Sequence, residues 1–164
     1  MCRTDAKRPK LIVFDLDYTL WPFYVDTHVS PPFKEEKGKI VDRHGRKVDV
    51  YPDVPEMLQN LKSQNYQMGV ASRTDDPDTA RQLLTILDWN KYFPHQEIYP
   101  GRKVTHFNKF AQRTGFSYKQ MLFFDDEMRN ITDVSKLGVT CVYVKDGMSQ
   151  EVIDEGLSRF ENQH

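Results

Sequence analysis

The chain has 164 residues, which is about one domain and long enough to bury a core. Its 23 Lys and Arg residues nearly balance its 24 Asp and Glu residues, and this net charge of -1 argues against a nucleic-acid-binding protein. The aromatic content of 12% excludes a disordered chain. The apolar run after the charged first ten residues covers only 11–14, too short for a signal peptide or a membrane helix. We therefore expect a cytoplasmic protein without a membrane partner.

The two cysteines do not provide a disulfide framework or a zinc site. Cys2 lies in the charged leader and Cys141 in an apolar run. We expect Cys141 to be a small buried hydrophobic residue rather than a nucleophile.

The first predicted element is a buried strand over 11–14, directly followed by Asp15. The segment 21–51 contains no convincing helix, but 40–41 and 47–50 flank a Gly-containing turn and predict a hairpin. A long insertion in a compact domain is usually functional or disordered, and the aromatic residues of this one favour a folded flap.

From residue 53 onward, helical and strand patterns alternate. Asp53 is expected to cap a helix in which apolar residues recur at helical spacing, followed by Pro55 in the first turn and Glu56 three residues on. Strands are then predicted at 66–71, 97–99, 121–124 and 139–144, with helices after 76–77, from about 103, over 130–137 and after Ser149. This order predicts an α/β fold, a doubly wound, Rossmann-like parallel sheet with helices on both faces, in one domain over 1–164.

Polar side chains follow four of the predicted strands. Strand by strand, they are Asp15 and Asp17, Ser72 and Arg73, Lys103, and Asp125 and Asp126. Ligands of an open parallel sheet bind beyond the carboxyl ends of its strands, so these groups should converge. Carboxylates that lie so close repel one another and imply a bound cation. Oxygen ligands without His or Cys favour Mg²⁺, commonly with a phosphate substrate.

Each of these signals alone has an ordinary explanation. Either acid of the Asp-x-Asp pair can cap a turn, and the pair Asp125 and Asp126 can cap a helix. Ser72 alone is typical of a turn, and Lys103 alone of a solvated surface. Their occurrence together, each at the end of a different strand, indicates a site.

The motifs resemble those of the haloacid dehalogenase superfamily. Residues 14–20 are similar to its first motif, 71–73 to its second, Lys103 to its third and 124–126 to its fourth. The longer stretches 15–22, 71–74, 99–107 and 123–127 resemble the magnesium-dependent phosphatase-one family across nearly the whole chain.

The resemblance implies a phosphomonoester hydrolase. Asp15 would be the nucleophile that forms an aspartyl-phosphate, and Asp17 the general acid and then the base. Mg²⁺ would be held by the Asp15 carboxylate, the Asp17 main-chain carbonyl and the Asp126 carboxylate, with Asp125 as an auxiliary group. Ser72 and Lys103 would hold phosphate oxygens. The family further implies substrate contacts by Leu16 (through its main chain) and Arg73, and we assign Tyr18 and Thr19 to shaping the loop.

The segments between the motifs leave no room for a separate cap domain of the kind found in this superfamily, so the site should be open. The resemblance implies sugar phosphates of the fructosamine-6-phosphate type or protein phosphotyrosine as substrates. We expect the enzyme to be a monomer. The flap aromatics could form an apolar wall beside the leaving group or pack the flap onto the domain; they are Trp21, Phe23, Tyr24, His28 and Phe33.

Two other functions use similar residues. A receiver-type signalling domain phosphorylated on Asp also gathers acids, a hydroxyl and a Lys around Mg²⁺, but its acid pair follows the first strand and its phosphorylated Asp the third. Here the order is the reverse. A phosphate-binding protein that has lost activity is disfavoured because every catalytic position is filled.

Overall fold

The computed structural model describes residues 7–164, so Cys2 lies outside the described part of the chain. Five parallel strands form the central sheet in the order β5-β4-β1-β6-β7. They are β1 (Leu11–Phe14), β4 (Met68–Ser72), β5 (His95–Ile98), β6 (Met121–Asp125) and β7 (Thr140–Tyr143). β1 is the central strand: β4 and β5 extend the sheet on one side of it, and β6 and β7 extend it on the other. The point where the strand order reverses is where such sheets bind ligands.

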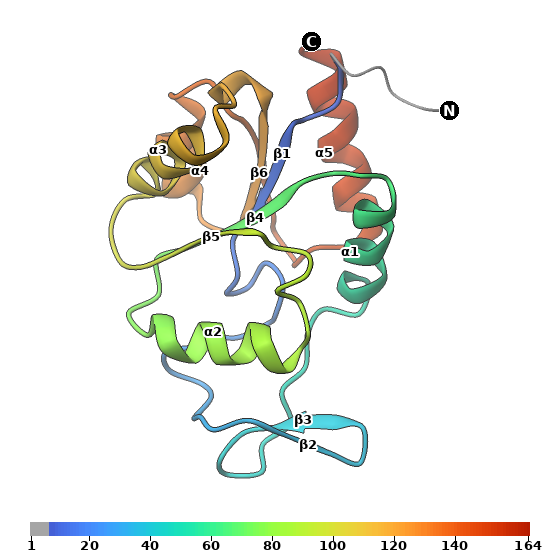
Figure 1. The fold of residues 1–164 in the computed structure, drawn as a ribbon, viewed down its shortest axis with the longest axis vertical. Helices are drawn as coiled ribbons and strands as arrows, with labels where there is room; N and C mark the ends of the chain where they lie inside the picture. Colours follow the sequence, from blue (N-terminus) through green and yellow to red (C-terminus); the bar gives the residue numbers. More distant parts are fainter. Residues whose placement is uncertain (1–6) are drawn as a thin grey trace.

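Helices cover both faces of this sheet (Figure 1). They are α1 (Val54–Ser63), α2 (Pro77–Ile86), α3 (Lys103–Thr114), α4 (Met128–Ser135) and α5 (Gln150–Asn162), with a short 3-10 turn η2 (Tyr118–Gln120). Side chains of β1 alternate between the faces: Ile12 and Phe14 belong to the apolar cluster that contains α1, α2 and α5 residues. Leu11 and Val13 belong to the cluster with α3 and α4. The doubly wound α/β prediction is therefore confirmed.

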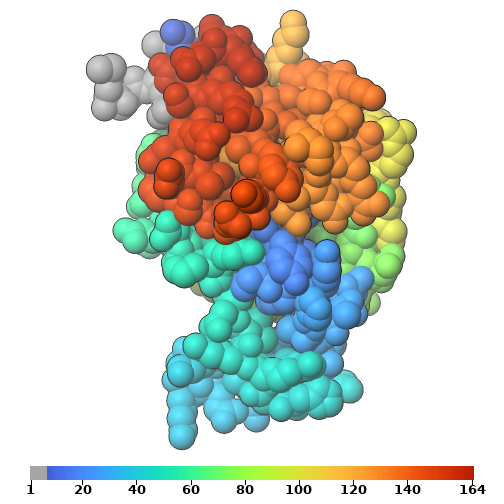
Figure 2. All heavy atoms as spheres, turned by 180° about the vertical axis from the view of Figure 1, so that it is seen from behind, coloured from blue at the N-terminus to red at the C-terminus, as the bar shows by residue number. Residues whose placement is uncertain are grey.

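The flap projects from the body of the domain (Figures 1 and 2). It contains an antiparallel hairpin, β2 (Lys34–Glu36) and β3 (Lys39–Val41). The predicted pairing of 40–41 with 47–50 is present but short: an antiparallel bridge joins Val41 and Lys47, and Val48 N donates to Ile40 O at 2.8 Å. The regular hairpin of the flap is shifted toward the N-terminus, to β2 and β3. Lys37 and Gly38 explain the shift: their φ angles of 54° and 78° suit the two-residue turn that joins hairpin strands.

Two α-helices begin with a side-chain cap. Asp76 accepts a hydrogen bond from Thr79 N at 3.1 Å, and Ser149 accepts one from Val152 N at 3.2 Å. Asp53 occupies the N-cap position of α1 but makes no side-chain cap bond. Its backbone is already helical, and its carboxylate accepts instead from Gln150 N at 3.0 Å, which ties α1 to the start of α5.

No helix within residues 7–164 is long and apolar enough to cross a membrane. Cys141 is half-buried, and burial raises the pKa of its thiol to about 12. A thiol with such a pKa stays protonated at neutral pH, so Cys141 is not an activated nucleophile.

Candidate active site

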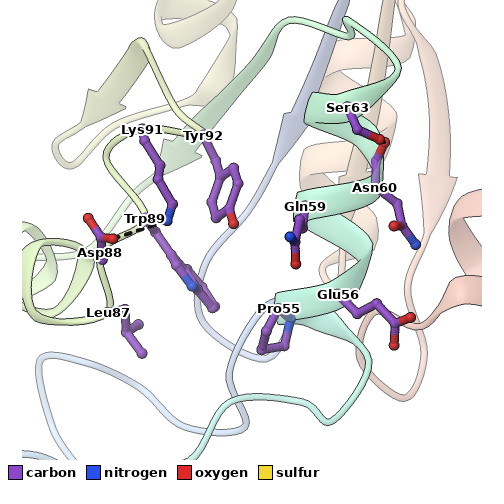
Figure 3. A pocket seen from close by; sticks show the side chains of 10 residues that line it. All are labelled: Pro55, Glu56, Gln59, Asn60, Ser63, Leu87, Asp88, Trp89, Lys91 and Tyr92. Carbon is purple, nitrogen blue, oxygen red and sulfur yellow. Dashed lines mark hydrogen bonds and ion pairs between the residues drawn. The ribbon is translucent and has the colours of Figure 1, made fainter.

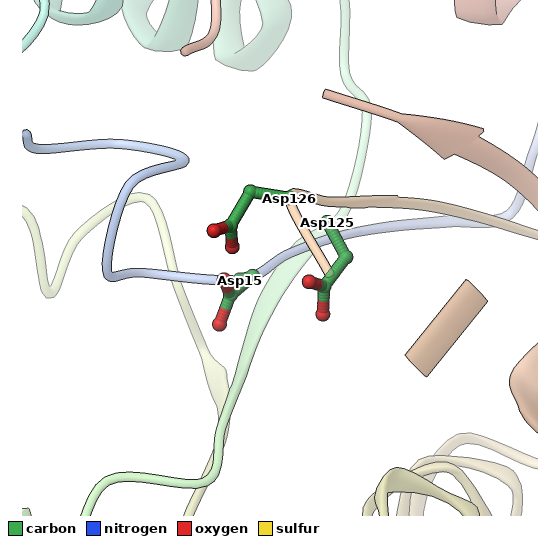
Figure 4. Close-up of side chains that lie close together, drawn as sticks. All are labelled: Asp15, Asp125 and Asp126. Carbon is green, nitrogen blue, oxygen red and sulfur yellow. The ribbon is translucent and has the colours of Figure 1, made fainter. Parts of the chain in front are cut away.

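Three carboxylates meet at the carboxyl edge of β1 and β6 (Figure 4). Asp15 directly follows β1, Asp125 ends β6 and Asp126 comes next. The strands are neighbours in register, and Asp15 N donates to Phe124 O at 3.0 Å. One carboxylate oxygen from each of the three residues lies within 4.8 Å of the others. Parallel pairing thus brings together acids that are 110 positions apart in the sequence.

Lys103 is the cation of this cluster. It begins α3, its side chain is buried, and its Nζ donates to Asp15 Oδ1 at 2.8 Å and to Asp125 Oδ2 at 2.6 Å. Burial alone would lower the pKa of Lys103, but the charges of Asp125 and Asp15 outweigh it and raise that pKa. The ammonium therefore stays charged and links the ends of β1 and β6 to α3.

The buried acids hold their protons more tightly than free carboxyls do. Burial raises the pKa of Asp15 to about 7, against the lowering effect of the Lys103 charge. Burial likewise raises the pKa of Asp125 to about 6 and that of Asp17 to about 7. Such shifts are frequent at catalytic sites, where a carboxyl must exchange a proton near neutral pH.

The turn after β1 places Asp17 beside this cluster. The Leu16 carbonyl accepts from the amides of Thr19 and Leu20, and Tyr18 has a left-handed φ of 56°. The turn folds back so that Asp17 Oδ1 accepts from Trp21 Nε1 at 2.8 Å and from Val25 N at 3.0 Å. Asp17 is therefore held by the segment that leads into the flap.

Ser72 ends β4 and is held by two hydrogen bonds. Its hydroxyl accepts from Thr74 N at 3.2 Å, and its carbonyl lies 2.8 Å from His106 Nε2. His106 is fully buried one turn after Lys103 on α3. This histidine joins α3 to the end of β4. Its spacing of three residues from Lys103 places both on one helix face, which was the available signal.

Asn130 is a site residue that the sequence analysis missed. Its Nδ2 donates to Asp125 Oδ2 at 3.0 Å, and its Oδ1 accepts from Arg73 at 3.0 Å. Arg73 is thereby aimed across the site from β4 to α4. An Asn in a polar helical segment has no local feature that distinguishes it, so only the fold reveals this bridge. Thr19 also reaches the cluster, donating to Asp15 Oδ2 at 3.2 Å.

The predicted residues open into a small surface pocket of about 190 Å³. Asp15, Asp17, Ser72, Arg73 and Lys103 all line it, together with Tyr24, Asp26, Thr74, Asp75, Glu127, Arg129 and Asn130. A larger hollow of about 690 Å³ lies between α1 and the loop after α2 (Figure 3). None of the predicted site residues lines that hollow. The predicted site residues are therefore found at the smaller pocket and not at the larger hollow.

The donor set fits a hard divalent cation. One ammonium faces three carboxylates, which leaves negative charge for a cation to neutralise. All of these ligand atoms are oxygens, as Mg²⁺ prefers. Both Asp125 oxygens already accept hydrogen bonds, from Lys103 and Asn130 and from Glu127 N, whereas Asp126 is half-buried.

The flap aromatics divide between the two roles considered for them. Trp21 and Phe23 are buried and pack in the core, so they do not form a wall beside the leaving group. Phe33 packs against the same core. Tyr24 remains 44% exposed and lines the small pocket.

The chain matches the family model described as acid phosphatase over residues 7–163. It is 54% identical over 156 residues to magnesium-dependent phosphatase 1 of Homo sapiens, covering 94% of this chain and 89% of that protein. It is 42% identical over 144 residues to a HAD-like hydrolase superfamily protein of Schizosaccharomyces pombe, covering 80% and 83%.

Solved structures show the same fold at low sequence identity. A HAD-superfamily hydrolase from Ehrlichia chaffeensis superposes with a TM-score of 0.65 at 12% identity, covering 95% of this chain and 97% of that one. The N-terminal part of a Bacteroides fragilis protein, containing a phosphatase domain complexed with Mg, has a TM-score of 0.63 at 15% identity. That match covers 93% of this chain and 39% of the other.

Proposed function

The chain belongs to the acid phosphatase family within the haloacid dehalogenase superfamily and is a magnesium-dependent phosphatase, and on that premise we propose that Asp15 attacks the phosphorus of a phosphomonoester. The observation that carries the proposal is the pocket of about 190 Å³, in which the Asp15 carboxylate lies beside Lys103, Ser72 and Asp17. The receiver-type alternative is set aside, because the relatives are phosphatases and the order of acids along the chain is reversed.

The first step forms a covalent bond between an Asp15 oxygen and phosphorus and breaks the bond from phosphorus to the leaving oxygen. Asp17 donates its proton to that leaving oxygen, which departs as an alcohol or phenol. In the second step Asp17 takes a proton from water, the water oxygen attacks phosphorus, and phosphate leaves Asp15. The raised pKa of Asp17, about 7, supports a group that gives and takes a proton near neutral pH.

Mg²⁺ would be held by the carboxylates of Asp15 and Asp126 and by the main-chain carbonyl of Asp17. When bound, it would neutralise phosphate charge and the repulsion among the acids. Asp125 supports this set indirectly, because its oxygens accept from Lys103, Asn130 and Glu127 N.

The remaining polar groups would bind the phosphate. Lys103 and Ser72 would donate to its non-bridging oxygens and offset the charge that develops in transfer. Arg73, held by Asn130, and the main chain of Leu16 would contact the substrate. The small pocket without a cap domain supports sugar phosphates or protein phosphotyrosine as substrates, with the exposed Tyr24 at its rim.

The test is hydrolysis of p-nitrophenyl phosphate with Mg²⁺ by the wild type and by Asp15→Asn. We expect the variant to lose turnover completely, because an amide cannot attack phosphorus, while Asp49→Asn in the exposed part of the flap keeps wild-type rates. Acid-quenched turnover mixtures reduced with borohydride should yield homoserine at position 15 by mass spectrometry. Turnover in excess EDTA, or activity in Asp15→Asn, would contradict the proposal.

A further inference from the structure

The side chain of Asp17 is asymmetrically held. Its Oδ1 accepts two hydrogen bonds, from the Trp21 indole at 2.8 Å and from Val25 N at 3.0 Å. Both donors belong to the segment between β1 and the flap hairpin. The same carboxyl group lines the small pocket, half-buried.

This asymmetry distinguishes the two oxygens chemically. An oxygen whose lone pairs face two N–H donors cannot also carry a proton directed at a substrate. The acid form of Asp17 therefore carries its proton on Oδ2. We propose that Trp21 is a positioning residue for phosphoryl transfer, whose indole N–H holds Oδ1 so that Asp17 delivers its proton to the leaving group from Oδ2.

The surroundings of Trp21 fix the direction of its indole N–H. The residue is fully buried, and its ring stacks on Phe23 at 5.6 Å and on Trp89 at 6.3 Å between centroids. Its carbonyl accepts from Tyr18 N at 2.7 Å, which closes the turn around Asp17. Stacking on two aromatic rings fixes the plane of the indole, and a fixed plane fixes the direction of its single donor.

A purely structural role would be equally satisfied by the same bond, since a buried indole N–H needs an acceptor. The inference rests on the proposed function, in which Asp17 is the general acid, and adds which residue aims it. The two roles differ in one measurable way. Loss of proton delivery matters most when the leaving group is a poor one, whereas loss of packing affects all substrates alike.

The experiment compares phenyl phosphate, which needs a proton on its leaving oxygen, with p-nitrophenyl phosphate, whose phenolate departs without one. We expect Trp21→Phe to lower kcat/KM, which excludes the hydrolysis step that both substrates share, roughly tenfold more for phenyl phosphate than for p-nitrophenyl phosphate, with the Mg²⁺ requirement little changed. Asp17→Asn should show the same selectivity at a loss of ~10²–10⁴-fold for phenyl phosphate. In the Asp17→Asn background, Trp21→Phe should add no further selectivity.

The matched control is Trp89→Phe, which trims a neighbouring indole but keeps an aromatic ring against Trp21 and leaves the Trp21 N–H bonded to Asp17. We expect it to affect both substrates by the same factor. If thermal denaturation shows that Trp21→Phe does not fold, 3-benzothienylalanine is incorporated at position 21 instead. This residue keeps the bicyclic ring and replaces the N–H by sulfur, so it should reproduce the selective loss.

The outcomes separate the two proposals. Equal losses on both substrates in Trp21→Phe or its benzothienyl counterpart, with selectivity retained in Asp17→Asn, would overturn the role of Trp21 and leave Asp17 as the acid. An Asp17→Asn enzyme without leaving-group selectivity would overturn the acid role in the proposed function and this inference with it.

Discussion

Lys103 neutralises part of the negative charge of the carboxylates in the site. It is 1% exposed and contacts Asp15 and Asp125, so its methylene stem and its charge are both buried. Removing one partner of a buried ionic group leaves the other charges uncompensated, which is costlier than the net value of the pair. Lys103 is thus both a phosphate-binding candidate and the group that keeps two carboxylates at one sheet edge.

Lys103→Met keeps the volume of the side chain and removes its charge. We expect a loss of at least about 100-fold in kcat and a loss of about 3–5 kcal/mol in the unfolding free energy in EDTA at pH 8. At pH 5 the destabilisation should be smaller, because the acids it leaves behind are then protonated. Urea unfolding at the two pH values checks this, with Lys109→Met on the exposed face of α3 as the control. The same loss at both pH values would contradict it.

The flap is held as an element by one buried carboxylate. Asp42 is 1% exposed and accepts from the amides of Ser30, His44 and Arg46 at 3.1, 2.9 and 3.0 Å. Burial alone would raise the pKa of Asp42, but hydrogen bonds from Arg46 and the other amides outweigh it and hold that pKa at about 2. The folded flap is therefore stabilised above the unfolded pKa of about 3.9, and this stabilisation is lost as the pH falls toward 2.

Asp42→Asn should loosen the flap without unfolding the domain. Hydrogen bonds to a charged acceptor contribute about 1.5–3 kcal/mol, so amide exchange at Ser30, His44 and Arg46 should accelerate roughly tenfold or more. Hydrogen exchange at neutral pH measures this, and the amides of β1 should stay protected. Asp49→Asn, an exposed partner of Lys47, is the control. Unchanged exchange in the flap of Asp42→Asn would refute the anchoring role.

At the level of the whole molecule, the buried acids of the site lower the stability of the fold when they are ionised. The pKa values of about 7 for Asp15 and Asp17 and about 6 for Asp125 exceed the unfolded value of about 3.9. The folded protein then binds more protons than the unfolded chain between about pH 4 and 7, so stability falls as the pH rises through that window. His106 acts in the opposite sense, because burial lowers its pKa.

We therefore expect the Tm in EDTA to fall between pH 5 and pH 8, and the gain in Tm on adding Mg²⁺ to grow over the same range. Differential scanning calorimetry measures both quantities. Asp15→Asn removes one titrating acid and leaves His106 in place, so its Tm should fall less steeply. An increment from Mg²⁺ that is independent of pH would mean that the acids do not form the ion site.

The local elements could be predicted because their signals are local. Helical spacing of apolar residues, the helix starts after 76–77 and Ser149, and short apolar runs depend on neighbours within one turn or one strand. The positions of Asp15, Ser72, Lys103 and Asp125 follow, since each comes at the end of a strand or the start of a helix. The α/β class and the metal chemistry were therefore accessible from the sequence alone.

What only the tertiary structure decided are contacts between segments whose order in the chain says nothing of their distance. Asn130 reaches Arg73, His106 reaches the Ser72 carbonyl, and Asp53 bonds Gln150 instead of capping its own helix. Trp21 was expected as a wall residue or as packing, yet its ring is stacked so that its N–H meets Asp17. The physical reason is common to the contacts of Asn130, His106 and Trp21: a buried polar group must find a partner, and the packing of whole elements chooses which one it finds. The Asp53 contact is exposed and follows from the packing that places the start of α5 beside α1.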